Sequence, residues 1–224
     1  MPSIQLYSAG AGRASGQMTS FRAFSQAGIS QYILFMKKFM ILCALPIAIA
    51  GAYGDVYAIS NLNESPSEQE GWVWEAFADR VMGGKSELAN PVIMESDDGQ
   101  KALLLAGRVI TKGGGFIQVR LRHEKGKFDA SAYSGIEIEV DARTPNSWYV
   151  FVRTRDNFFP WSYYRAQFTP LPERSVIRIP WNAFAAESTG RKAIRPEYLS
   201  SIGIVAAFED FNAYMRIYRV GLYR

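Results

Sequence analysis

Short segments in which apolar and polar residues alternate restrict the fold of this chain more than any other feature. The clearest apolar faces are formed by Ile117, Val119 and Leu121, by Ile136, Ile138 and Val140, and by Trp148, Val150 and Val152. A period of two is the spacing of a β-strand with one buried face. Turn residues, such as Ser134-Gly135 and Thr144-Pro145-Asn146, separate nine or ten such segments from Trp72 onward. We therefore predict an all-β fold, an antiparallel β-sandwich or jelly roll, with very little helix.

The first 58 residues have the composition of a targeting segment. Met36-Lys37-Lys38 is positively charged, the following run to Ala52 is apolar, and Val56-Tyr57-Ala58 resembles the end of a signal peptide. Residues 1–35 contain no acidic residue and are interpreted as an over-extended start or a leader, and their composition also suits an organelle transit peptide. We expect an exported protein, periplasmic or extracellular, with a mitochondrial location as the alternative.

The expected organisation is a leader over 1–35, a signal peptide over 36–58, a flexible acidic linker over 59–71 and one β-sandwich domain over 72–224. The formal charge of +4 falls to +1 after Ala58, because four of the 25 basic and one of the 21 acidic residues lie before it. This balance argues against nucleic-acid binding. The apolar leader segment is short and contains Pro46 and Gly51, so we expect no stable membrane span after cleavage.

Catalytic sets are difficult to assemble from this sequence. The only cysteine is Cys43, in the leader, and the only histidine is His123, which we interpret as a solvated turn residue among charged neighbours. Neither a nucleophile–base pair nor a metal-ligand spacing can be built around it. Glu137 and Glu139 lie on one predicted strand, whereas glycosidases use carboxylates that flank the substrate. We predict no enzymatic activity, no cofactor and no metal.

Two stretches rich in glycine lie beside predicted strands. They are Asp79-Arg80-Val81-Met82-Gly83-Gly84-Lys85-Ser86 and Gly113-Gly114-Gly115-Phe116-Ile117-Gln118-Val119-Arg120. Glycine permits tight turns and close approach of two backbones, so we expect the two corners to face each other. Neither matches a phosphate-binding pattern. Two interpretations of the first stretch remain: a contact rim of Asp79, Arg80 and Ser86, or a structural turn in which Met82 closes the end of the core.

These stretches belong to a longer series of matches. With Trp74, Gly107, Tyr133-Ser134-Gly135-Ile136 and Ile179-Pro180-Trp181, they resemble the complex I intermediate-associated protein 30 family over residues 72–222. The resemblance implies a galactose-binding-like β-sandwich. It also implies a role in the assembly of NADH:ubiquinone oxidoreductase, through a protein partner in a respiratory complex.

The polar faces of the central strands supply the remaining binding candidates. Arginines and aromatic rings alternate there, which suits recognition of a sugar or an acidic peptide. The alternative is an ordinary sheet face on which Glu137, Glu139 and Asp141 pair with these arginines. Trp161, in a loop with Phe158 and Phe159, is expected to be exposed. The predicted ligand- or partner-binding residues are Asp79, Arg80, Met82, Gly83, Gly84, Ser86, Gly114, Gly115, Phe116, Arg120, Tyr149, Arg153 and Trp161.

These residues give two functional hypotheses. The first is a non-catalytic binding or assembly domain that acts through protein contacts. The second is a carbohydrate-binding module that binds a glycan on the same face.

Overall fold

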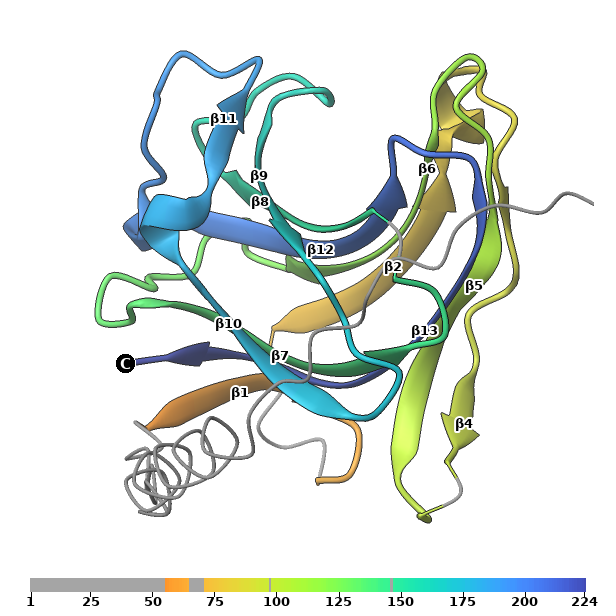
Figure 1. Cartoon of the computed structure of the whole chain (residues 1–224). Helices are drawn as coiled ribbons and strands as arrows, with labels where there is room; N and C mark the ends of the chain where they lie inside the picture. The colour runs from red at the N-terminus through yellow and green to blue at the C-terminus, as the bar shows by residue number, and fades with distance from the viewer. Residues whose placement is uncertain (1–54, 65–70, 97, 146) are drawn as a thin grey trace, which may run out of the picture. The chain divides into compact units, whose positions relative to one another are not determined.

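Two antiparallel sheets stack face to face in this computed structural model, which describes residues 55–64, 71–96, 98–145 and 147–224 (Figure 1). The first sheet has the order β10-β7-β13-β5-β3, with β1 beside β13 and β4 beside β5. Its strands are β1 (Val56–Asn61), β3 (Glu87–Leu88), β4 (Ile93–Glu95), β5 (Lys101–Val109), β7 (Gly135–Ala142), β10 (Ser175–Pro180) and β13 (Phe211–Tyr223).

The second sheet has the order β11-β9-β8-β12-β6-β2. Its strands are β2 (Trp72–Ala78), β6 (Phe116–His123), β8 (Trp148–Thr154), β9 (Tyr163–Phe168), β11 (Ala185–Glu187) and β12 (Leu199–Ala207). Helical structure in the described residues is confined to short 3-10 turns at Asp79–Met82, Trp181–Ala183 and Pro196–Tyr198. The predicted antiparallel β-sandwich is therefore confirmed.

The core lies between the sheets and contains the predicted apolar faces. On β6, Ile117, Val119 and Leu121 are at most 1% exposed, and the alternate residues point to the opposite, outer face of the second sheet. Ile136, Ile138 and Val140 on β7 and Trp148, Val150 and Val152 on β8 are also buried. Removing these side chains from water is the main stabilising contribution to such a sandwich. The outer face of the second sheet is consequently left for other roles.

The N-terminal boundary of the fold differs from the expectation. Val56–Asn61 forms strand β1, which pairs with β13, and Ile59 is fully buried. The predicted linker over 59–71 is therefore wrong for residues 59–61, because they belong to a strand that pairs with β13 and the side chain of Ile59 joins the core. Cleavage after Ala58 would cut β1 in two. The rest of the predicted leader and signal peptide, residues 1–54, and residues 65–70 of the predicted linker lie outside the described residues.

Candidate functional site

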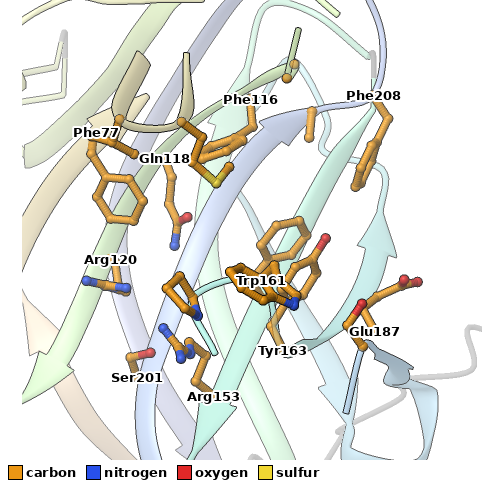
Figure 2. A pocket seen from close by; sticks show the side chains of 18 residues that line it. Phe77, Phe116, Gln118, Arg120, Arg153, Trp161, Tyr163, Glu187, Ser201 and Phe208 are labelled. Carbon is orange, nitrogen blue, oxygen red and sulfur yellow. The ribbon is translucent and has the colours of Figure 1, made fainter. Parts of the chain in front are cut away.

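A cleft of about 770 Å³ lies on the outer face of the second sheet (Figure 2). Its hollow follows from side-chain size. The central strand β12 points small residues outward, among them Ser201, Gly203 and Ala207, which line or underlie the cleft. Its neighbours carry large residues in the same rows: Gly203 lies between Arg120 on β6 and Phe151 on β8. A row of small side chains between two rows of large ones forms a groove.

Gly203 also determines how Gln118 lies. A Cβ atom at Gly203 would come within 2.0 Å of Nε2 of Gln118, so only glycine leaves room for this amide across β12. Gln118 is 6% exposed and lines the floor of the cleft. It supplies a planar donor and acceptor in otherwise apolar surroundings.

Aromatic rings from two segments form one wall of the cleft. Phe151 on β8 stacks on Tyr163 on β9, with ring centroids 4.3 Å apart and 18° between the planes. In the loop between these strands, Phe159 and Trp161 form a second stack with nearly parallel planes, with ring centroids 5.2 Å apart and 9° between the planes. Trp161 is 56% exposed, which confirms the expectation for this residue. Figure 2 shows Trp161 and Tyr163 close together in the middle of the site.

Phe208 covers the opposite end of this wall. Its ring meets that of Tyr149 edge-to-face at 5.0 Å, and Tyr149 is only 8% exposed. Tyr149, a predicted binding residue, has its side chain on the outer face, as its position on the strand requires, but Phe208 lies against it and Tyr149 is not among the residues that line the cleft. The accessible aromatic surface at this point belongs to Phe208, which is 49% exposed.

The two glycine corners lie in contact, as expected, and Asp79 joins them. The Ser86 backbone N–H donates to Oδ1 of Asp79 (2.9 Å), and the Ser86 hydroxyl donates to Oδ2 (2.7 Å). The N–H groups of Gly115 and Phe116 donate to the same Oδ2 at 2.5 and 3.4 Å. Asp79 and Ser86 are fully buried, so their predicted role as a contact rim is wrong. The carboxylate instead provides the acceptors that the backbone N–H groups of both corners need.

The adjacent glycines give this carboxylate its space. A Cβ atom at Gly84 would lie 2.1 Å from Cγ of Asp79, and one at Gly114 would lie 2.7 Å from its Cβ. Gly83 adopts a left-handed conformation (φ 87°) that ends the 3-10 turn. Gly83 and Gly84 therefore shape the corner and are not among the residues that line the cleft, whereas Gly114, Gly115 and Phe116 line it.

Met82 is outside the core. It is 57% exposed and lines the cleft together with Val81, so the alternative in which it closes the end of the core is wrong. The short turn ends before the chain reaches the core and leaves both side chains at the rim. Arg80, also predicted, is exposed but is not among the residues that line the cleft.

The charged residues of the cleft pair differently from the expectation. Arg120 and Arg122 share one carboxylate, Glu75 on β2, with contacts of 2.5 Å each. Burial acts to raise the pKa of Glu75, but the hydrogen bonds from these two arginines outweigh it and lower the pKa. The expected partners Glu137, Glu139 and Asp141 are on the first sheet and pair with arginines there. Strand alternation gave the correct faces, but it could not assign each strand to a sheet.

Arg153 has no carboxylate partner among the described residues. Its Nη2 group donates to the carbonyl oxygens of Asn157 (2.8 Å) and Phe159 (2.9 Å). Burial, and secondarily the charge of Arg120, lower the pKa of this guanidinium. The two carbonyls fix the orientation of Arg153, and Figure 2 shows it beside Ser201 at the same end of the site as Arg120.

His123 is buried, so the prediction of a solvated turn residue is wrong. It is the last residue of β6, 8% exposed, and its ring packs against Trp72 at 5.0 Å and Phe128 at 5.9 Å. Burial, with a smaller contribution from Lys125, lowers its pKa. The alternation of β6 extends one residue farther than expected, which turns this side chain toward the core.

Several residues of the cleft were missed at the level of sequence, namely Phe77, Gln118, Tyr163, Glu187, Ser201 and Phe208. The outward positions of Ser201, Gly203, Val205 and Ala207, all small or medium-sized, contained the signal for a groove. Phe208 and Ser188 carried no such signal. They are the non-glycine residues with positive φ in the described part of the chain, at 67° and 49°, and both line the cleft. Such strained conformations gather at functional sites.

Two kinds of feature are absent from the described residues. Within them, no group of three or more His, Cys, Asp or Glu side chains is arranged to hold a metal ion. Over the same ranges, we find no helix with the length and apolar character needed to cross a membrane.

Comparison with solved structures gives carbohydrate-binding modules of the same fold. One is a family 11 carbohydrate-binding module from Clostridium thermocellum in complex with a β-1,3-1,4-mixed-linked tetrasaccharide, with 12% identity, a TM-score of 0.57, and coverage of 77% of this chain and 96% of that one. Another is the family 11 module of the cellulosomal cellulase Lic26A-Cel5E from the same organism, with 10% identity, a TM-score of 0.56, and coverage of 76% and 95%. At these identities the likeness establishes the fold only.

Sequence comparison identifies the family. No curated protein sequence matches the chain. Residues 62–214, well over half of its length, match the family described as complex I intermediate-associated protein 30 (CIA30). The match includes both glycine corners, the arginines of the cleft and the loop of Trp161. This chain therefore belongs to the complex I intermediate-associated protein 30 family.

Proposed function

We propose that this protein is a non-catalytic binding domain that holds a segment of a partner protein in the cleft of the second sheet. The observation that carries the proposal is the concentration of exposed apolar side chains around the cleft. Val81 (71% exposed), Met82 (57%), Trp161 (56%) and Phe208 (49%) all line it. Phe158 and Phe159, 86% and 58% exposed, lie in the same loop as Trp161. Apolar patches of this kind, rimmed by polar residues, mark interaction sites.

The types of these residues favour a polypeptide ligand. Tryptophan, tyrosine and arginine are the usual anchors of protein interfaces, and methionine adapts its shape to an apolar partner. The aliphatic side chains of Val81 and Met82 have no evident role in stacking on a sugar ring, but they suit the side chains of a peptide. The family is named for its association with intermediates of complex I, and this name supports a protein partner. It suggests that the partner is a component of a respiratory complex.

The charged groups support binding rather than catalysis. Glu187 is the one carboxylate among the described residues that line the cleft, and Arg165 pairs with it at 2.6 Å. Glycoside hydrolysis uses two carboxylates on opposite sides of the scissile bond. A binding role does not require such a pair of carboxylates.

A glycan is the second candidate ligand, and the Phe159–Trp161 pair favours it. The two rings are stacked and each is more than half exposed, so the pair offers an exposed aromatic face on which a sugar ring could stack. The family 11 module with its bound tetrasaccharide provides a precedent for sugar binding on this fold.

A random peptide display library and a glycan array, screened in parallel against residues 55–224, distinguish the two ligands. We expect enriched peptides that bind the wild type and lose at least about tenfold in affinity with Trp161→Ala or Met82→Ala, because both side chains would be buried by the ligand. Val176→Ala is the matched control, since Val176 is 40% exposed on β10 of the first sheet. Glycans that bind, and lose binding with Trp161→Ala, would replace the peptide as the ligand. If neither array yields a ligand sensitive to Trp161→Ala, the proposal fails.

For the compartment, we propose export, as the leader indicates, with cleavage before β1. N-terminal sequencing of the mature protein tests this. A mature chain that begins at or before Val56 keeps the strand whole, and one that begins at Ile59 would contradict the boundary proposed here.

A further inference from the structure

Four arginines gather at one end of the cleft. A second hollow of about 280 Å³ shares Arg120, Arg153 and Ser201 with the cleft, so the two are continuous. Arg122 and Arg155 also line it, and no carboxylate is among its described lining residues. The strand register brings these groups together, because Ser201 on β12 lies between Arg122 on β6 and Arg153 on β8. We call Arg120, Arg122, Arg153 and Arg155 the arginine cluster.

The positive charge of the cluster is only partly compensated within the described residues. Glu75 serves both Arg120 and Arg122, with Oε2 and Oε1 respectively. Arg153 contacts only the neutral carbonyl oxygens of Asn157 and Phe159, and Arg155 forms no ion pair with a described residue. The exposed Glu124 also acts on Arg122, whereas at His123 its effect is opposed by that of Lys125. Four arginines thus share one directly paired carboxylate, Glu75, with Glu124 as a more distant negative charge.

Arg153 is pre-oriented to bind an anion. Both of its hydrogen bonds use Nη2, so Nε and Nη1 make no hydrogen bond to any described residue. A guanidinium with free donors in a fixed plane binds a carboxylate through two parallel hydrogen bonds. Because Arg153 is half-buried and lies near the charge of Arg120, an anion at this point would relieve both unfavourable effects.

We infer that the partner segment carries a carboxylate that binds the arginine cluster, while its apolar side chains occupy the cleft between Phe116, Phe151 and Trp161. This inference rests on the proposed function and names the chemistry of the partner: an acidic segment with an Asp or Glu side chain adjacent to apolar residues. Because the two hollows share three lining residues, the carboxylate and the apolar side chains lie next to each other along the segment.

Paired synthetic peptide sets test the inference. Each set holds capped, fluorescently labelled peptides with two or three aromatic or aliphatic residues, followed by one fixed position that is Glu in one set and Gln in the other. Binding to residues 55–224 is measured by fluorescence anisotropy. We expect the Glu peptides to bind about tenfold more tightly than the Gln peptides, as a charge-assisted hydrogen bond allows. Raising the salt concentration should remove much of this difference.

Substitutions assign the difference to the cluster. Arg153→Gln and Arg122→Gln should each reduce the preference for Glu over Gln to less than about threefold, and Arg153→Lys should restore only part of it, because lysine lacks the planar fork. Arg108→Gln is the control, since it removes one exposed arginine from β5 of the first sheet and should leave the preference unchanged. Arg122 is more exposed than Arg153, so its variant remains informative if Arg153→Gln disturbs the loop.

The outcomes separate this inference from the proposed function. Equal affinity for Glu and Gln peptides, with binding still lost in Trp161→Ala, would retain the proposed function and overturn the acidic ligand. A Glu preference that persists in both arginine variants would also overturn it. Binding of uronate oligosaccharides, but of neither peptide set, with dependence on Arg153 would keep the anion site and overturn the protein partner.

Discussion

The outer faces of the two sheets contain the same residue types but use them differently. On the first sheet, Glu137 accepts hydrogen bonds from Arg178 and Arg219, at 2.7 Å each, and Asp141 accepts from Arg216 at 2.9 Å. Glu139 pairs with Arg174 at 2.7 Å. Each of these arginines has a carboxylate partner, so the face is electrostatically satisfied by its own side chains.

The outer face of the second sheet is left incomplete. Its arginine cluster shares one carboxylate, and its aromatic rings border an open groove. Exposed arginines and aromatic residues are therefore not sufficient to indicate a binding face. The second sheet differs in two respects: small residues on its central strand leave a hollow, and the positive charge near the hollow is only partly compensated. The experiments below test this division between a stabilising face and a binding face.

The largest effect is expected from Asp79→Ala, which removes the support of the cleft rim. The backbone N–H groups of Ser86 and Gly115 would lose their acceptor while remaining buried, and we expect a loss of about 3 kcal/mol or more in the free energy of unfolding. Urea unfolding followed by tryptophan fluorescence measures it. Arg80→Ala, at the exposed neighbouring position, should cost less than about 0.5 kcal/mol. Equal small losses in both variants would show that Asp79 does not hold the corners.

A smaller loss of stability is expected from Asp141→Asn on the first sheet. Asp141 is 2% exposed and accepts from Arg216 and from the Tyr218 hydroxyl (2.6 Å), so neutralising it leaves a half-buried guanidinium without its counter-charge. We expect a loss of about 2 kcal/mol with no change in binding at the cleft. Parallel urea unfolding and peptide anisotropy measure both. A loss of binding together with intact stability would contradict the division between the two faces.

The smallest effect is a pH dependence from His123 beside the arginine cluster. Its pKa is lowered in the folded protein, so below pH 6.5 the unfolded chain takes up a proton that the folded one does not. The stability that depends on this residue is present above about pH 6.5 and is lost as the pH falls toward the lowered pKa. Urea midpoints measured from pH 7.5 to 5 should fall for the wild type and fall less for His123→Phe. Parallel curves would rule out a contribution of His123.

The sequence predicted much of the fold because strand alternation records which side chains are buried. The faces of β6, β7 and β8 were correct, and Arg120, Arg153, Phe116 and Trp161 were correctly placed at the outer face of one sheet or in its loop. Alternation is a local property, however. It could not show that β7 belongs to a different sheet from β6 and β8, so Glu137, Glu139 and Asp141 were paired with the wrong arginines.

Residues whose role depends on distant segments were placed less well. Asp79 is polar and precedes a glycine turn, which is typical of an exposed loop, yet it is fully buried because four donors, two of them on a corner about 36 positions later, converge on it. The position of Tyr149 in β8 places its side chain on the outer face, but the ring of Phe208 covers it. Val56-Tyr57-Ala58 resembles the end of a signal peptide, but these residues belong to β1, whose backbone pairs with β13.

The order of apolar and polar residues by itself determined that this chain forms antiparallel strands with one buried face each, as the two stacked sheets show. The tertiary structure decided which face has the groove and the partly compensated charge on which the proposed binding role rests. The physical reason is that a groove and a net charge are properties of neighbouring strands. Small side chains on β12 form a hollow only because β6 and β8 carry large ones beside them. The arginines there give this face a net positive charge because the carboxylates of β7 lie on the other sheet.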